Sequence, residues 1–116
     1  LLLGARSLVA VDVDPSAVDA TRRTAALNGV ADRAEVSDRP LREVQGGFEL
    51  VLANLLVPVV EDLGAGLAAA VAPGGHLVVG GILHRQEERA VAAVGLPVTS
   101  VDRSGPWSAL VCSRAG

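Results

Sequence analysis

The chain has 116 residues, close to the commonest size of one domain, and half of them are hydrophobic. Its ten basic and thirteen acidic residues give a net charge of −3, which disfavours a nucleic-acid surface built from clustered positive charge. The longest apolar stretches, such as residues 51–60, are too short and interrupted to span a bilayer, and no signal segment opens the chain. We therefore expect a soluble, cytoplasmic protein without membrane contact. Cys112 is alone in an apolar run, which indicates a small buried side chain and no cysteine metal site.

The amino-terminal part predicts one short strand followed by a helix. The opening LLLGAR resembles the last turn of a helix stopped by Gly4. Residues 7–12 form a short β-branched run that is typical of a buried parallel strand. A helix is predicted from Pro15 to Asn28, with Asp14 as its N-cap and Gly29 at its end.

Strand and helix patterns alternate along the remaining sequence. Two helices are predicted, one opened by Pro58 and stopped by Pro73 and the glycines after it, the other over residues 85–95. Alternation implies an α/β fold with a largely parallel sheet covered on both faces, and a closing hairpin makes the last strand antiparallel. The apolar continuity of its third strand suggests a central position in the sheet. The predicted strands after the first are residues 34–37, 48–54, 76–82, 97–102 and 107–113.

Aspartates follow the first two predicted strands. Asp12 ends the first strand, and ligands of open α/β sheets bind beyond the carboxyl ends of the strands. A carboxylate there can accept hydrogen bonds from both hydroxyls of a ribose, or it can be an exposed acid in a turn. Asp38 follows the second strand, where it can accept a hydrogen bond from an adenine amine or be an ordinary loop acid.

Asn54 ends the strand over residues 48–54, where its side-chain oxygen can reach into the same cleft. That oxygen can accept a hydrogen bond from an amine and so aim the nitrogen lone pair at an electrophile. A turn or capping asparagine is the alternative. No general base is evident: His84 lies on the correct side of the sheet but reads as an exposed loop residue, and His76 lies at the opposite end.

Taken in order, five segments of the chain resemble the class I S-adenosylmethionine-dependent methyltransferases. Within that class, the chain is most similar to the bacterial methyltransferases that modify the stalk-base ribosomal protein, large-subunit protein eleven. The similarity covers nearly the whole chain at compatible spacings. The segments are VAVDVDPSAV (9–18), NGVADR (28–33), VLANLLVPVV (51–60), APGGHLVVGGIL (72–83) and the terminal strand with Trp107.

The resemblance implies a Rossmann-like mixed sheet with an antiparallel last strand and S-adenosylmethionine as cofactor. Asp12 matches the acid that binds the ribose hydroxyls, with Val13 beside the adenine. Asp38 falls near the adenine-binding loop, and Asn54 matches an asparagine close to the transferred methyl group.

The reaction implied by the resemblance is an in-line displacement, in which an amine nitrogen attacks the methyl carbon of a sulfonium. Asn54 is then the catalytic residue, and Leu55 and Leu56 form the wall of the substrate cleft. A protonated lysine has no lone pair, so burial in an apolar cleft must lower the pKa of the amine. The implied partner is a protein substrate, a lysine side chain or N-terminal amine of a ribosomal protein, with no direct nucleic-acid or metal binding.

The chain departs from this class in one respect. The class requires a first strand ending in an acid and a glycine-rich loop, E/D-x-G-x-G-x-G, and no segment here matches it. We expect residues 1–116 to be the carboxy-terminal portion of a single methyltransferase domain, in which strands 7–12 and 48–54 lack their shared neighbour. The family's amino-terminal substrate-recognition domain is not matched either. The chain alone is expected to bind S-adenosylmethionine at millimolar concentration or not at all, and micromolar binding in titration calorimetry would contradict this.

Two alternatives stay open on the sequence. An acid after the second strand of a Rossmann-like sheet also serves a nicotinamide dinucleotide, so the chain can be part of an oxidoreductase. The stretch ANLL (53–56) and the closing hairpin disfavour that interpretation. The other alternative is a non-catalytic remnant that acts as a binding or structural module. The sequence immediately upstream of Leu1 would discriminate among the three.

Overall fold

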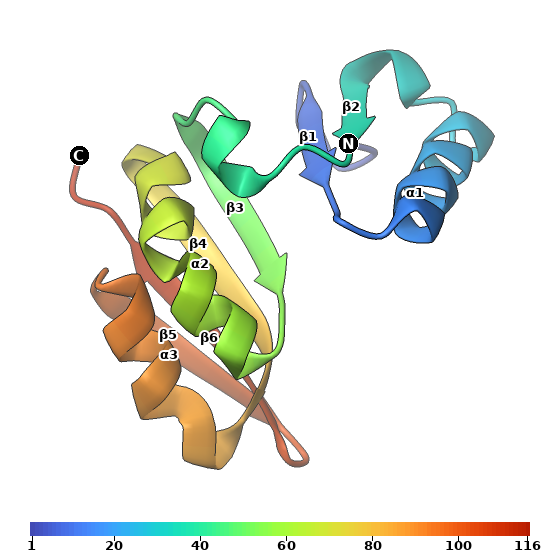
Figure 1. Ribbon diagram of the computed structural model, residues 1–116. Helices are drawn as coiled ribbons and strands as arrows, with labels where there is room; N and C mark the ends of the chain where they lie inside the picture. Colours follow the sequence, from blue (N-terminus) through green and yellow to red (C-terminus); the bar gives the residue numbers. More distant parts are fainter. The chain divides into compact units, whose positions relative to one another are not determined.

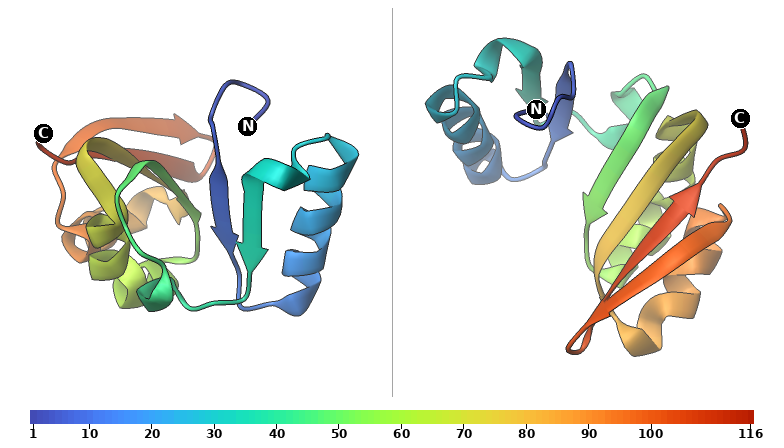
Figure 2. Two further views of the ribbon diagram at one scale, coloured as in Figure 1. Left: turned by 90° about the horizontal axis from the view of Figure 1, so that it is seen from above. Right: turned by 180° about the vertical axis from the view of Figure 1, so that it is seen from behind.

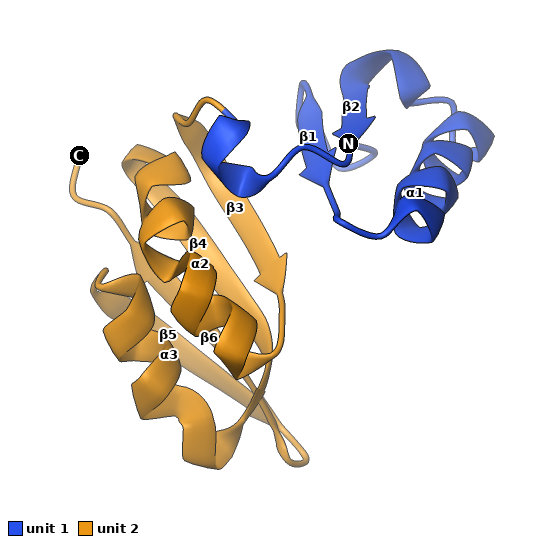
Figure 3. Cartoon of the chain, viewed as in Figure 1, with its two compact units in different colours: residues 1–44 blue, residues 45–116 orange.

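The computed structural model describes residues 1–116 and divides them into two compact units, unit 1 over residues 1–44 and unit 2 over residues 45–116 (Figure 3). Unit 1 has a parallel two-stranded sheet, and unit 2 has a mixed four-stranded sheet. None of the helices combines the length and the apolar character needed to cross a membrane.

Unit 1 is a β-α-β arrangement. Strands β1 (Leu8–Val11) and β2 (Ala34–Ser37) are parallel and in register from Leu8 opposite Ala34 to Val11 opposite Ser37. The helix α1 (Pro15–Leu27) connects them, and short 3-10 turns, η1 (Ala31–Arg33) and η2 (Leu41–Glu43), precede and follow β2. Both strands therefore end at the same edge of their sheet.

The start of α1 is fixed by its first residues, as predicted. The carboxylate of Asp14 accepts a hydrogen bond of 2.9 Å from the backbone N–H of Ser16, and Pro15 occupies a position where no donor is needed. Gly29 adopts a φ of +70° after the last turn. Val18 is the buried residue of the helix, which places its inner face on the strands.

Unit 2 is a four-stranded sheet with two helices on one face (Figure 1). The strands lie in the order β3 (Phe48–Asn54), β4 (Val71–Leu83), β6 (Trp107–Ser113) and β5 (Val98–Ser104). β3 is parallel to β4, and β6 is antiparallel to both β4 and β5. Seen from behind, the other face of this sheet carries no helix of unit 2 (Figure 2). The helical elements of unit 2 are α2 (Val57–Ala70), η3 (His84–Gln86) and α3 (Glu87–Val94).

The core of unit 2 consists of small aliphatic side chains between the helices and the sheet. Each fully buried Val, Leu or Ile contributes about 1.5–3 kcal/mol relative to exposure. The two helices approach closely at Gly64, where an added Cβ would overlap the backbone of Ala93. Cys112 is fully buried, as predicted, and burial raises the pKa of its thiol. The residues without solvent exposure are Val60, Val71, Leu77, Val79, Ile82, Ala90 and Cys112.

Two predicted helix boundaries are wrong. Residues 1–4 form a turn with one hydrogen bond, from Gly4 N–H to Leu1 O, and one such bond does not sustain a helix. The helix α2 ends at Ala70 and not at Pro73. Val71 is extended and pairs with Phe48, so its β-branched, fully buried side chain belongs to the sheet.

The expected central position of β3 also differs from the structure. β3 is an edge strand that pairs only with β4, and both helices of unit 2 lie on one face. A continuous apolar run indicates that both faces of a strand are apolar, but it does not indicate how many strands pair with that strand. Ala53 is buried, whereas Leu50 and Leu52 alternate with it and are exposed. β1 belongs to the two-stranded sheet of unit 1, and β3 belongs to the four-stranded sheet of unit 2.

Candidate functional site

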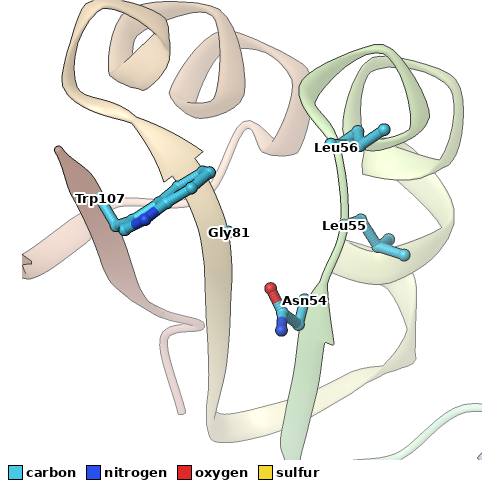
Figure 4. A pocket seen from close by; sticks show the side chains of 5 residues that line it. All are labelled: Asn54, Leu55, Leu56, Gly81 and Trp107. Atoms are coloured by element: carbon cyan, nitrogen blue, oxygen red, sulfur yellow. The ribbon is translucent and has the colours of Figure 1, made fainter.

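A pocket of about 500 Å³ lies at one edge of the sheet in unit 2 (Figure 4). Parallel strands end at the same edge, so Asn54 at the end of β3 lies beside Gly80 near the end of β4. The chain then leaves the sheet through Leu55 and Leu56 toward α2. The lining residues are Asn54, Leu55, Leu56, Gly81 and Trp107.

The carboxamide of Asn54 is fitted against the backbone of β4. Its Oδ1 occupies the space that a Cβ on Gly81 would fill, and Figure 4 shows this oxygen facing that strand. Gly81 has a φ of +77°, a left-handed conformation that other residues adopt only at a cost. The position of the Asn54 side chain therefore depends on glycine at residue 81.

Trp107 reaches the pocket because β6 runs against the direction of its neighbour. The first residue of an antiparallel strand lies at the edge where the other strands end, and Trp107 pairs with Leu83 at the end of β4. Its side chain is 51% exposed, and the indole lies across β4 above Gly81 (Figure 4). The pocket thus has an aromatic side chain on one side and the segment that follows Asn54 on the other (Figure 4).

A carboxylate network lies next to Trp107. Glu87 accepts hydrogen bonds from Arg103, at 2.7 Å from Nη2 to Oε1 and 3.0 Å from Nε to Oε2, and a further one from the hydroxyl of Ser108. The hydrogen bonds from Arg103 and then Ser108, with the positive charge of Arg103, lower the pKa of Glu87 to about 2, against the opposing effect of desolvation. This side chain is an acceptor throughout the neutral range and not a proton carrier.

His84 does not act as a side chain of the pocket. It is exposed, and its Nε2 lies 3.2 Å from the carbonyl oxygen of Trp107, to which it donates in the Nε2-protonated tautomer. The pocket itself has no titratable side chain in its lining. The arrangement can therefore orient and desolvate an amine but contains no built-in base.

Three predicted cofactor residues lie in unit 1, at the edge where β1 and β2 end. Asp12 follows β1 and Asp38 follows β2, and the Asp12 N–H donates to Ser37 O across the pair. Val13 is 85% exposed. Asp38 also lines a smaller pocket of about 160 Å³, together with Pro15, Val18, Asp19 and Arg22 of α1.

Asp12 has the chemistry that a ribose requires. It is exposed, and one carboxylate oxygen accepts a 2.9 Å hydrogen bond from the Asp14 N–H, which fixes the side chain in a local turn. The fixed carboxylate can accept further hydrogen bonds from two neighbouring hydroxyls. The residue types after β1 therefore fit the ribose of a nucleoside cofactor, with an apolar side chain next to it.

The structure brings Asn54, Leu55 and Leu56 into one pocket, and it also adds two residues that were not predicted from the sequence. Gly81 is the second glycine of a GG pair, which reads as a strand interruption until its proximity to Asn54 is known. Trp107 is the single tryptophan of the chain and opens the last strand. The predicted antiparallel direction of that strand is the signal that could have placed it at the site.

Sequence comparison relates the chain to one family. The family profile described as "Ribosomal protein L11 methyltransferase (PrmA)" matches residues 1–115. The ribosomal protein L11 methyltransferase of Geobacter sulfurreducens is 41% identical over 117 residues, covering 98% of this chain and 38% of that protein. The corresponding protein of Geobacter sp. (strain M21) is 43% identical over 110 residues, covering 94% of this chain and 36% of its own length. The chain thus spans well under half the length of these curated relatives.

Structure comparison confirms the expected fold. A ribosomal protein L11 methylase from Lactobacillus delbrueckii subsp. bulgaricus superimposes with a TM-score of 0.87 at 30% identity, covering 99% of this chain and 61% of that one. An RNA methyltransferase from Salinibacter ruber, solved in complex with S-adenosyl-L-homocysteine, has a TM-score of 0.71 at 21% identity and covers 92% of this chain and 65% of its own. The second likeness concerns the fold alone.

Proposed function

The chain belongs to the ribosomal protein L11 methyltransferase family, and on this premise we propose that the whole protein transfers a methyl group from S-adenosylmethionine to an amine of a ribosomal protein. The acceptor is a lysine side chain or an N-terminal amine. Family membership favours this activity over the dinucleotide oxidoreductase that the sequence left open. A non-catalytic remnant is the outcome to be excluded by experiment.

The observation that carries the proposal is the pocket around Asn54. A carboxamide oxygen at the end of a strand is a hydrogen-bond acceptor for an amine N–H, and the aliphatic and aromatic lining suits the methylene stem of a lysine. Leu55 and Leu56 remain the proposed substrate wall, to which Trp107 is added. We propose Asn54 as the catalytic residue on this basis.

The residues of this chain position the acceptor and exclude water. S-adenosylmethionine supplies, when bound, a methyl carbon attached to a positively charged sulfur. Asn54 holds the amine by one N–H, so that the nitrogen lone pair is directed away from the carboxamide. The low-polarity lining disfavours the ammonium form of the amine and releases its proton to solvent, since no base lines the pocket.

The proposed cofactor residues are Asp12, Val13, Asp38 and Asn54. The carboxylate of Asp12 binds the ribose hydroxyls, and the exposed Val13 side chain packs on the adenine. Asp38 accepts a hydrogen bond from the adenine amine. The support for these roles is the chemistry of each side chain and the common edge at which β1 and β2 end.

We also propose that residues 1–116 form the carboxy-terminal portion of a single methyltransferase domain. The support is the coverage of 38% of the length of a curated relative and the unpaired outer edges of β1 and β3. If a further strand pairs with these edges in the whole protein, backbone amides there will exchange hydrogen more slowly than in the 116-residue chain. Equal exchange rates would contradict this part of the proposal.

A ribosomal protein substrate implies work in the cytoplasm, where that substrate is made, with no membrane partner and no direct contact with nucleic acid. The test of the proposed function is isotope transfer. The whole protein is incubated with ribosomal protein L11 and methyl-labelled S-adenosylmethionine, with an unrelated ribosomal protein as the control. Label in L11 alone is expected, and unlabelled L11 would overturn the proposal.

A further inference from the structure

We propose that Glu87 is a positioning residue: together with Arg103 and Ser108, its carboxylate fixes the end of the β5–β6 hairpin that carries Trp107 in the wall of the Asn54 pocket. The effect on catalysis rests on the proposed function. The positioning itself is a property of this chain and is tested separately.

The geometry of Glu87 joins both strands of the hairpin. Arg103 of β5 and Ser108 of β6 stand opposite each other in the strand register. Both donate to the one carboxylate of Glu87, which lies in the first turn of α3. The helix therefore holds the hairpin directly beside Trp107.

His84, in the turn just before α3, contacts the backbone at Pro106 and Trp107. The N–H of His84 donates to Pro106 O at 3.3 Å, and its ring Nε2 lies 3.2 Å from Trp107 O. The backbone is thus tethered before, at and after the tryptophan, although its side chain is half exposed. An indole with only two side-chain torsions on a fixed backbone presents a rigid wall.

The ion pair between Glu87 and Arg103 differs from an ordinary surface ion pair. Arg89 and Glu61 also form a bidentate pair, between α3 and α2, but their side chains are 51% and 42% exposed, and exposed pairs contribute little. The Glu87 side chain is 16% exposed and accepts an additional hydrogen bond from Ser108, which is buried. A partly buried carboxylate with three donors defines a geometry as well as a charge contact.

The test compares Glu87→Gln with Glu61→Gln in the 116-residue chain. Each variant removes a carboxylate from an arginine pair, but only the first pair touches the hairpin. The chain has one tryptophan and no tyrosine, so its fluorescence reports on Trp107 alone. Glu87→Gln is expected to lower the fluorescence anisotropy and to raise the acrylamide quenching constant, while Glu61→Gln matches the wild type. Unchanged anisotropy and quenching in a folded Glu87→Gln chain would overturn the proposal.

A second variant covers the case in which Glu87→Gln does not fold. Arg103→Gln removes only the donor from β5, at a side chain that is 57% exposed, and leaves the carboxylate and Ser108 in place. Arg103→Gln is also expected to lower the fluorescence anisotropy and to raise the acrylamide quenching constant, but by less than Glu87→Gln does. A folded Arg103→Gln chain with wild-type fluorescence would also count against the proposal.

Activity of the whole protein separates this inference from the proposed function. Glu87→Gln is expected to lower kcat/KM for the acceptor by about tenfold to a hundredfold, as follows from displacing a substrate-contacting wall by about an ångström. Glu61→Gln is expected to keep the wild-type value. If the wild type transfers no methyl group, the proposed function fails while the fluorescence result still decides the role of Glu87. If Glu87→Gln keeps wild-type fluorescence and activity, the positioning role of Glu87 is contradicted while the proposed function stands.

Discussion

The side-chain oxygen of Asn54 occupies the space that a Cβ on Gly81 would fill. The two residues lie on neighbouring parallel strands, so the side chain of Asn54, the proposed catalytic residue, packs where β4 carries no side chain. The candidate site therefore depends on a residue that contributes no side chain.

Gly81→Ala is expected to displace Asn54 and to reduce methyl transfer by the whole protein by about a hundredfold, the effect of a small misplacement at a reacting centre. Gly95→Ala is the matched control, because Gly95 has a similar φ of +73° but nothing within 4 Å of an added Cβ. Both variants are expected to lose about 1–2 kcal/mol of stability from the left-handed backbone. Equal activity in the two variants would show that the contact with Asn54 is unimportant.

Asp12 and Asp14 are expected to separate cofactor binding from helix stability. Asp12→Ala removes the proposed ribose ligand and should raise the Kd for S-adenosylmethionine of the whole protein by about tenfold or more, the loss of charge-assisted hydrogen bonds. Asp14→Ala removes the cap on Ser16 and should cost about 1 kcal/mol of unfolding free energy with little change in affinity. Titration calorimetry and urea unfolding measure the two quantities. The reverse pattern would reassign the two aspartates.

The stability of the chain should depend on pH through Glu87. Its pKa is lowered from 4.5 to about 2 by the hydrogen bonds of Arg103 and Ser108, with Arg103 and His84 as the nearby charges. A lowered pKa means that this stabilisation is present above the ordinary value and is lost as the pH falls from 4.5 towards 2. The difference in urea midpoint between wild type and Glu87→Gln should shrink across that interval. A difference that stays constant with pH would contradict the lowered pKa.

Two glycines of α2 should respond to alanine in opposite directions. Gly64 packs against Ala93 of α3, so Gly64→Ala is expected to destabilise unit 2 by about 1–3 kcal/mol through overpacking. Gly66 is exposed on the same helix, so Gly66→Ala should stabilise it by about 0.5–1 kcal/mol. Thermal unfolding distinguishes the two. Stabilisation by both substitutions would mean that the helices do not approach closely at Gly64.

The local elements could be predicted from the sequence because each depends on neighbouring residues. The bounds of β2, β3 and β6 agree with the predicted strands, and Asp14 caps α1 as its position before Pro15 indicates. The end of α2 could not be predicted in this way. The burial of Val71 against the sheet, and not the proline after it, decides where that helix stops.

Only part of the candidate site could be predicted from the sequence, because the rest depends on how distant strands pair. Asn54, Leu55 and Leu56 are consecutive, so a strand end predicts that they stand together. Gly81 and Trp107 join them through strand pairing, which depends on the order and direction of strands far apart in the chain. Residues brought together by pairing need the topology first, and the local pattern of Gly81 gives no sign of its partner.

The most direct measurement of the central claim is a comparison of kcat and cofactor affinity for Asn54→Ala in the whole protein. If Asn54 directs the acceptor amine at the methyl group, kcat should fall by about a hundredfold or more while the Kd for S-adenosylmethionine changes much less. Asp12→Ala should show the opposite balance. Small and equal changes in both quantities for both variants would contradict the assignment of this pocket as the site of methyl transfer.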